Sequence, residues 1–153
     1  MSLPTELSLE KEGNDYKICF APAKELENLE AGWYDSLKSI ISPEGQACKI
    51  VLTPEAGTKG EWRLTIGSLR LTADFYSNIL SVEDTETHVY YMKERISAGQ
   101  EISFIFDQEV IEVFAENGKV YGAAETEENI LGMDWEVFRT EDLKASEKMC
   151  LYK

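Results

Sequence analysis

Alternation of hydrophobic and polar side chains dominates this chain. In residues 62–66, for example, Trp62, Leu64 and Ile66 alternate with polar residues. A period of two, combined with β-branched and aromatic residues, predicts β-strands. Many short strands at close spacing favour an all-β fold, a two-sheet antiparallel β-sandwich of jelly-roll or concanavalin type. Similar patterns predict further strands at residues 6–10, 15–20, 47–53, 69–75, 78–82, 87–92, 102–106, 110–115, 119–124, 134–139 and 147–152.

Two of these strands carry the strongest burial signal. Phe104 and Phe106 share one side of their strand, whereas Val113 and Phe114 are neighbours of opposite parity in the next strand. We expect all four side chains to be buried. The second strand must then be covered on both faces, as a central strand in a layered structure would be.

Helix and turn signals are few. Only residues 22–30 favour a helix, of one or two turns, because Pro22 suits a first helical turn. Residues 31–41 are ambiguous, since Gly32 weakens any helix there. Asn117 and Gly118 both tolerate positive φ, so they predict a two-residue hairpin turn between two strands at 110–116 and 119–124.

Length and charge exclude several classes of function. The chain has 153 residues, enough for one domain with a core, and its net charge is −14. Such a surface repels phosphate backbones and anionic lipids, so neither nucleic acid nor membrane is an expected partner. Cys19, Cys48 and Cys150 lack metal-type spacing and are expected to be buried free thiols. With no signal peptide visible, free thiols favour a cytoplasmic location.

The sequence offers little for catalysis. His88 is the only histidine, and strict alternation in residues 87–92 places it mid-strand beside Tyr90 and Met92 on one face, which indicates a structural role. Gly-rich phosphate loops are absent. We therefore predict no catalytic residue, no metal ligand and no cofactor. Trp33, Trp62 and Trp135 are candidates for a sugar-stacking platform, although tryptophan in a sandwich core is the commoner arrangement.

Two stretches carry a family resemblance. The first is Leu-Pro-Thr-Glu-Leu-Ser-Leu at residues 3–9, followed by Tyr-Lys-Ile at 16–18 and by Pro-Ala-Lys-Glu-Leu-Glu-Asn-Leu at 22–29. The second spans residues 102–118. In this order they resemble the C-terminal β-sandwich of glycoside hydrolase family 32, the β-fructosidases. The signature residues that match are structural ones, namely Asp107, Glu112, Phe114, Asn117 and Gly118.

The resemblance implies a module without its catalytic partner. Family members carry catalysis on an N-terminal β-propeller marked by Asn-Asp-Pro, Arg-Asp-Pro and Glu-Cys motifs, none of which occurs here. We expect residues 1–30 to form a junction segment leading from such a propeller, and residues 31–153 to form the sandwich module. The resemblance implies that the parent enzyme hydrolyses sucrose, sucrose 6-phosphate or fructans, and that the module stabilises the propeller.

The sequence suggests two kinds of partner, a protein surface bound through the junction segment and a carbohydrate. The junction segment offers apolar residues that a propeller would cover, and without it we expect a homodimer through the same residues. The alternative function is a carbohydrate-binding sandwich that recognises sugar through exposed aromatic residues. The junction residues concerned are Leu3, Leu7, Leu9, Ile18, Phe20, Leu26 and Leu29.

Overall fold

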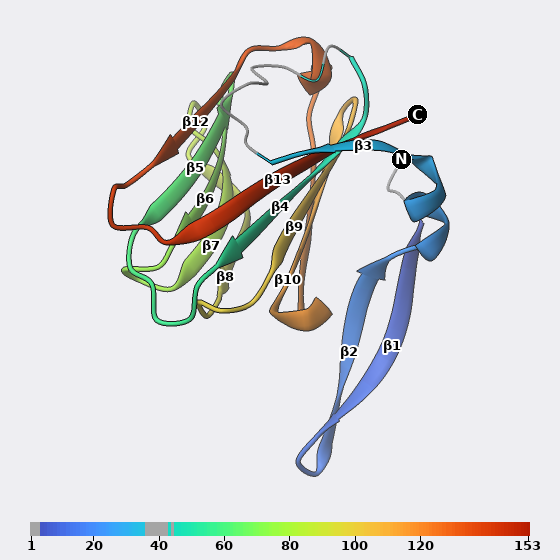
Figure 1. Cartoon of the computed structure of the whole chain (residues 1–153), viewed down its shortest axis with the longest axis vertical. Helices are drawn as coiled ribbons and strands as arrows, with labels where there is room; N and C mark the ends of the chain where they lie inside the picture. The colour runs from blue at the N-terminus through green and yellow to red at the C-terminus, as the bar shows by residue number, and fades with distance from the viewer. Residues whose placement is uncertain (1–3, 36–42, 44) are drawn as a thin grey trace.

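The computed structural model describes residues 4–35, 43 and 45–153. It shows two antiparallel sheets stacked face to face, with a separate two-stranded hairpin extending from one end (Figure 1). The predicted all-β, two-sheet antiparallel sandwich is confirmed. No helix among the described residues is long and apolar enough to span a lipid bilayer.

The strands are distributed over three sheets. The hairpin consists of β1 (Thr5–Glu12) and β2 (Asp15–Pro22). The six-stranded sheet has the order β11 (Val120–Glu125), β10 (Val110–Ala115), β9 (Ile102–Asp107), β4 (Cys48–Pro54), β13 (Ala145–Tyr152) and β3 (Glu30–Tyr34). The five-stranded sheet has the order β12 (Trp135–Arg139), β5 (Glu61–Ile66), β6 (Leu69–Asp74), β7 (Ile79–Asp84) and β8 (Val89–Arg95). Single 3-10 turns occur at η1 (Lys24–Leu29), η3 (Glu116–Gly118) and η4 (Ile130–Gly132).

Every predicted strand is present, most with boundaries within two residues. The short helix predicted at 22–30 is the 3-10 turn η1. The strand that the pattern did not predict is β3, at the start of the ambiguous stretch 31–41. Gly32 is tolerated there because β3 is an edge strand, paired only with β13. Residues 36–42 of that stretch lie outside the described residues.

The main core lies between the two large sheets. Trp62 stacks on Phe104 with ring centroids 5.2 Å apart, and Phe106 packs against Trp135 at 4.7 Å. Alternation holds across this interface, so Leu64 and Ile66 point inward with Trp62. Large aromatic rings therefore fill the space where the two sheets face each other.

Strand β10 is buried on both faces, as predicted. Val113 contributes to the core between the sheets, whereas Phe114 belongs to a second cluster on the other face of the same sheet. Phe104 and Phe106 share the inner face of β9 and are fully buried. The six-stranded sheet is therefore covered on both sides at this point.

The expected arrangement of β8 is wrong. His88 lies in the turn before the strand, with φ of 57°, and not in mid-strand. A register shift then occurs opposite Val82 and Glu83, so that Met92 pairs with Val82 while Tyr90 pairs with Glu83. This β-bulge puts Met92 in the core and leaves Tyr90 exposed, although they are two residues apart.

The β10–β11 hairpin is confirmed, but its turn is longer than predicted. Ala115 pairs with Val120, which leaves four residues in the connection instead of two. Asn117 and Gly118 both have positive φ, as expected, and so does Glu116. The Glu116 carboxylate accepts a hydrogen bond of 2.7 Å from the backbone N–H of Ser97, which holds the longer turn in place.

Gly118 meets a second constraint besides its φ of 86°. A Cβ at this position would lie 2.4 Å from the carbonyl oxygen of Phe20 in β2. Gly13 also has positive φ, but a Cβ there would meet no atom within 4 Å. The absence of a side chain at Gly118 therefore lets the N-terminal hairpin approach the sandwich.

We predict that Gly118→Ala lowers the free energy of unfolding by about 1–3 kcal/mol more than Gly13→Ala does. Both changes add the strain of positive φ, whereas only the first adds overpacking against Phe20. Chemical denaturation of the two variants and the parent chain measures this. Equal losses in both variants would show that the hairpin does not press on this turn.

Candidate functional site

The β1–β2 hairpin carries the clearest unpartnered surface of the described chain. Its register pairs Leu9 with Ile18 and Lys11 with Tyr16, so these side chains share one side with Leu7. Leu7, Leu9, Tyr16 and Ile18 are between 55% and 70% exposed, and we call these four the apolar hairpin face. In Figure 1 the hairpin points away from the sandwich.

The opposite side of the hairpin is polar and forms ion pairs with the sandwich. Lys119, in the β10–β11 turn, lies 3.4 Å from Glu12 and 3.9 Å from Glu10. Within the hairpin, Lys17 pairs with Glu12 at 2.7 Å. Hydrogen bonding from Lys17, with a further contribution from Lys119, holds the pKa of Glu12 below its usual range. The sandwich thus reaches the polar side of the hairpin through Lys119, while the four residues of the apolar hairpin face stay exposed.

The base of the hairpin continues into a second hydrophobic cluster. Phe20 stacks on Tyr121 with centroids 4.8 Å apart, and Tyr121 in turn packs against Phe114 at 5.2 Å. Leu26 of η1 belongs to the same cluster, together with Ile105 and Tyr152. Residues 20–29 therefore cover the outer face of the six-stranded sheet and fix where the hairpin leaves the body.

A buried carboxylate lies beside this cluster. Glu112 is fully buried, and the Tyr121 hydroxyl donates a hydrogen bond of 2.6 Å to its Oε1. Burial, followed by this contact, raises the pKa of Tyr121 to about 12. A buried carboxylate is costly unless it accepts hydrogen bonds, so Glu112 holds Tyr121 in the orientation that receives Phe20.

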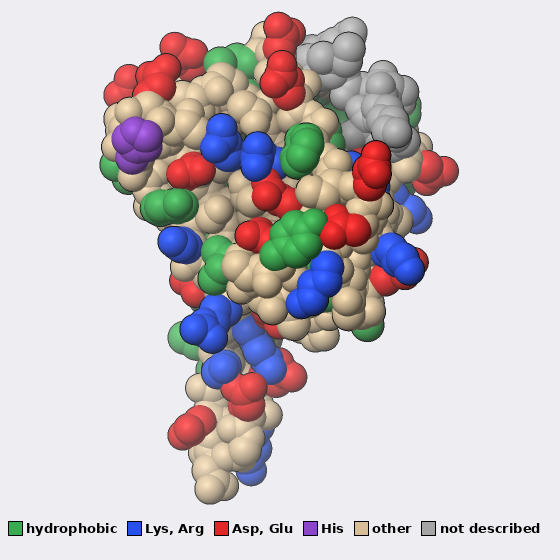
Figure 2. Space-filling view, turned by 90° about the vertical axis from the view of Figure 1, so that its left-hand side faces the viewer, with side chains coloured by type: hydrophobic (Ala, Val, Ile, Leu, Met, Phe, Trp, Pro, Cys, Tyr) green, Lys and Arg blue, Asp and Glu red, His purple; other side chains and the backbone are tan. Residues whose placement is uncertain are grey.

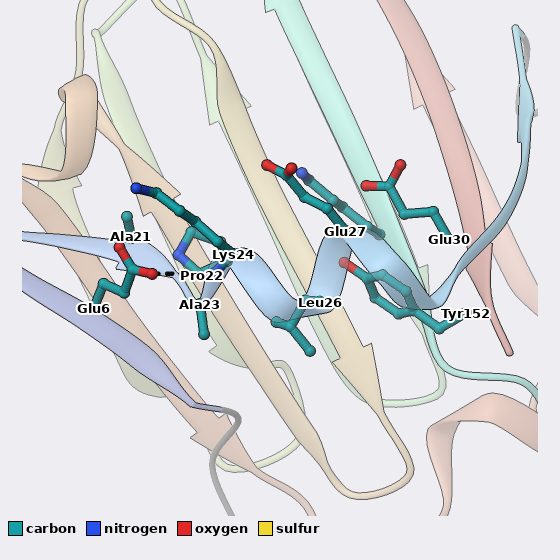
Figure 3. A pocket seen from close by; sticks show the side chains of 10 residues that line it. Glu6, Ala21, Pro22, Ala23, Lys24, Leu26, Glu27, Glu30 and Tyr152 are labelled. Carbon is teal, nitrogen blue, oxygen red and sulfur yellow. Dashed lines mark hydrogen bonds between the residues drawn. The ribbon is translucent and has the colours of Figure 1, made fainter.

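A small hollow of about 250 Å³ lies where the hairpin, η1 and β13 meet (Figure 3). The backbone N–H of Lys24 donates to the Glu6 carboxylate at 3.2 Å across it. Glu27 and Glu30 stand with Lys49 on the far side. No group of three acidic, His or Cys side chains that could hold a metal ion occurs within residues 4–35, 43 and 45–153.

The three tryptophans do not form one platform. Trp62 is fully buried and Trp135 is 6% exposed, so the prediction of a sugar contact is wrong for both, because each fills the core. The Trp135 Nε1–H donates to the Ile130 carbonyl at 2.9 Å. Trp33 is 45% exposed on β3, where its Nε1–H donates to Glu30 at 3.0 Å. Only Trp33 of the three is available to a ligand.

The remaining predicted residues have structural positions. Asp107 ends β9 and pairs with Val110 across a two-residue turn that starts with positive φ at Gln108. Neither turn residue is Gly or Asn, so this hairpin gave no turn signal in the sequence. Cys19, Cys48 and Cys150 are buried free thiols, as predicted.

Sequence reasoning missed Tyr121 and Lys119, two sandwich residues that contact the hairpin. One signal was available, because Glu112 and Tyr121 point to the same face of paired strands if Ala115 pairs with Val120. The predicted two-residue turn pairs residue 116 with residue 119 and gives this same register, so the predicted hairpin already placed Tyr121 on the face of Glu112. Lys119 has no pattern that distinguishes it from a solvated lysine.

Comparisons with known proteins place this fold. No family model and no curated protein matches the sequence. The structure superposes on sucrose-6-phosphate hydrolase from Lactobacillus gasseri with a TM-score of 0.68 and 14% identity, over 96% of this chain and 33% of that one. Exo-inulinase from Aspergillus awamori gives a TM-score of 0.71 at 14% identity, over 99% and 35% of the two chains.

A third enzyme agrees with the first two. Beta-fructofuranosidase from Schwanniomyces occidentalis matches with a TM-score of 0.61 and 8% identity, over 99% of this chain and 40% of the enzyme. The fold is shared with β-fructosidases. This confirms, at the level of fold, the resemblance read from residues 3–29 and 102–118. The chain spans about a third of the length of the first enzymes it matches.

We predict that Tyr121→Phe lowers the free energy of unfolding by about 1–3 kcal/mol at neutral pH. The ring stack is kept, but the buried Glu112 carboxylate loses the hydroxyl that donates to it. Tyr16→Phe, at an exposed tyrosine of the hairpin, is the matched control and should leave stability unchanged.

The same pair has an alkaline signature. The folded-state pKa of Tyr121, about 12, lies above the ordinary tyrosine value near 10. The stability from neutral Tyr121 is therefore complete below pH ~10 and is lost as the pH rises through about 12. Denaturation curves at neutral and alkaline pH should show a smaller alkaline loss in Tyr121→Phe than in the parent chain. If both chains lost the same free energy of unfolding at alkaline pH, the raised pKa would not belong to Tyr121.

Proposed function

We propose that this chain is the non-catalytic sandwich module of a β-fructosidase, joined through residues 1–30 to a catalytic propeller that it stabilises. The parent enzyme hydrolyses sucrose, sucrose 6-phosphate or fructans. The observation that carries the proposal is the exposed apolar hairpin face, on a hairpin that extends away from the sandwich (Figure 1). The shared fold, which makes up about a third of three such enzymes, supports the same role.

The hairpin is difficult to explain as part of a free-standing sandwich. A two-stranded sheet is marginally stable by itself in water, and a third layer is needed to cover an apolar side. The sandwich covers the apolar side only at Phe20, which pairs with Leu7, so the apolar hairpin face itself stays exposed. Contacts between domains of one chain commonly bury about 600–1,500 Å², which a hairpin of this size and its flanks can supply.

The buried acids of the sandwich support a non-catalytic role. Glycosidases of this class use two carboxylates facing one substrate. The two buried glutamates of the described residues are both used internally. Glu112 accepts from Tyr121, and Glu147 pairs with the Arg139 guanidinium at 3.0 Å. Glu112 therefore holds two neighbouring strands together, and Glu147 links the two sheets.

We predict that Leu9→Glu abolishes docking of this chain onto the propeller, because it places a charge in the apolar contact. Ser8→Glu is the matched control, since it adds the same charge one residue away on the opposite side of β1. Co-purification of each variant with a separately expressed propeller, encoded immediately upstream in the gene, measures docking. The proposal fails if that upstream region lacks the propeller motifs, or if Leu9→Glu docks as well as Ser8→Glu.

We also predict that the isolated chain self-associates through the apolar hairpin face, most simply as a two-fold dimer. The net charge of −14 opposes association, so added salt should strengthen it by screening. Sedimentation at low and high salt measures this, with Leu9→Glu expected to remain monomeric. A parent chain that stays monomeric at high concentration in both salts would show that this face does not bind a second copy.

A further inference from the structure

The outer face of the five-stranded sheet has a different character from the hairpin. Its side chains form cross-strand rows fixed by the register. One row runs Phe138, Arg63, Thr72, Ser81 and Lys93 from β12 to β8. The next row runs Glu136, Thr65, Arg70, Glu83 and Tyr90. Figure 2 looks onto this face, where acidic and basic side chains are interspersed with hydrophobic ones.

These rows produce a hollow in the middle of the sheet. Thr72 and Ser81 are short and adjacent, so they form a floor, while the longer Arg63 and Lys93 stand on either side in the same row. The resulting hollow measures about 410 Å³ and is lined mainly by β5, β6, β7 and β8. We call it the outer basin. Its volume falls within the range of small-molecule sites.

The basin continues beyond the two arginines. A second hollow of about 600 Å³ shares Arg63 and Arg70 as a wall and reaches Phe138 on β12. With neighbouring strands about 4.8 Å apart, the span from β12 to β8 is about 19 Å. An extended ligand fits this shape better than a compact one.

The charges in the outer basin balance. Its lining residues include three cations and three carboxylates, although the whole chain carries a net charge of −14. A charged ligand would be attracted by the three residues of opposite charge and repelled by the three of like charge. A neutral polyol suits both, because each hydroxyl donates to a carboxylate and accepts from a guanidinium or ammonium group. The six charged residues are Glu61, Arg63, Arg70, Asp74, Glu83 and Lys93.

Arg70 has donors to offer at the centre of this surface. Its closest carboxylate oxygen, on Glu83, lies 3.8 Å away, beyond hydrogen-bond distance. Its Nε–H is shielded from solvent and has no acceptor among the described residues, and the same holds for Arg63. Buried donors without acceptors are uncommon in folded proteins. A ligand hydroxyl that draws the guanidinium outward would provide the missing hydrogen-bond acceptor.

Aromatic rings stand at both ends of the two hollows. Tyr90 and Phe138 are each close to half exposed. Lys93 lies 4.8 Å from the centre of the Tyr90 ring, and the Arg63 guanidinium lies 5.2 Å from that of Phe138. Ring faces carry negative charge density and attract the C–H groups of a sugar, while the neighbouring cations hold the rings in position.

We propose that the outer basin binds a neutral oligosaccharide, with Arg70 and Glu83 bonding its hydroxyls and Tyr90 contacting its apolar ring face. This site is separate from the hairpin and does not require the propeller. The choice of fructan as first probe, however, rests on the proposed function. It also moves the expected sugar contact from the three tryptophans to the outward-facing side chains of the five-stranded sheet.

The test is a titration of the ¹⁵N-labelled chain, followed by amide chemical shifts. The probes are inulin-type fructo-oligosaccharide, levan-type fructo-oligosaccharide and malto-oligosaccharide. We expect saturable shifts confined to β12, β5, β6, β7 and β8, with a dissociation constant in the millimolar range. Arg70→Gln should weaken binding about tenfold, a loss of about 1.4 kcal/mol.

Two further variants make the result decisive. Tyr90→Ala should weaken binding by a similar factor, and its exposed position makes misfolding a small risk. Trp33→Ala, at an exposed aromatic residue of the other sheet, should leave binding unchanged. The amide spectrum of each variant reports directly whether the sandwich is folded.

Each outcome decides one question. Malto-oligosaccharide binding without fructan binding supports the basin and counts against the proposed fructan substrate. The inference is overturned if none of the three sugars gives saturable shifts, if the shifts centre on β3 and Trp33, or if Arg70→Gln and Tyr90→Ala bind as well as the parent chain.

Discussion

The fold depends on covering strand β10 on both faces. Val113 and Phe114 are adjacent and apolar, so the strand cannot sit at a solvated surface without exposing one of them. The five-stranded sheet covers the side of Val113. Residues 20–29 fold back over the side of Phe114, through Phe20 and Leu26. The position of the hairpin follows from this packing of residues 20–29 over Phe114.

The cover determines where the hairpin goes. Phe20 is the last large apolar residue of β2, and its stack on Tyr121 anchors the base of the hairpin to the sandwich. Glu112 stabilises this arrangement by accepting the Tyr121 hydroxyl in a buried setting. Gly118 permits it, because any Cβ would strike the Phe20 backbone. The rest of the hairpin then projects outward with its apolar face free, which is the geometry of a segment that bridges two bodies.

The two large sheets consequently differ in what they offer. The six-stranded sheet is covered on both faces near β10, so its aromatic residues serve packing. The five-stranded sheet is covered on its inner face only, and most outward positions of β5, β6 and β7 are polar. The two proposals therefore assign ligand recognition to the five-stranded sheet and association with a large partner to the hairpin.

The sequence by itself determined the strands, the inner core and the family resemblance. Period-two alternation is a local property, so it identified β5, β9 and β10 and the inward direction of Trp62, Phe104 and Phe106. Features that depend on contacts between distant residues were decided only by the tertiary structure. The bulge opposite Val82 separates Tyr90 from Met92, and the packing of Phe20 on Tyr121 brings the hairpin to the sandwich. Whether a tryptophan lies in a core or on a surface likewise depends on which sheet covers it. Alternation shows which side of its strand a side chain occupies. Only the packing of distant segments decides whether that side faces water or protein.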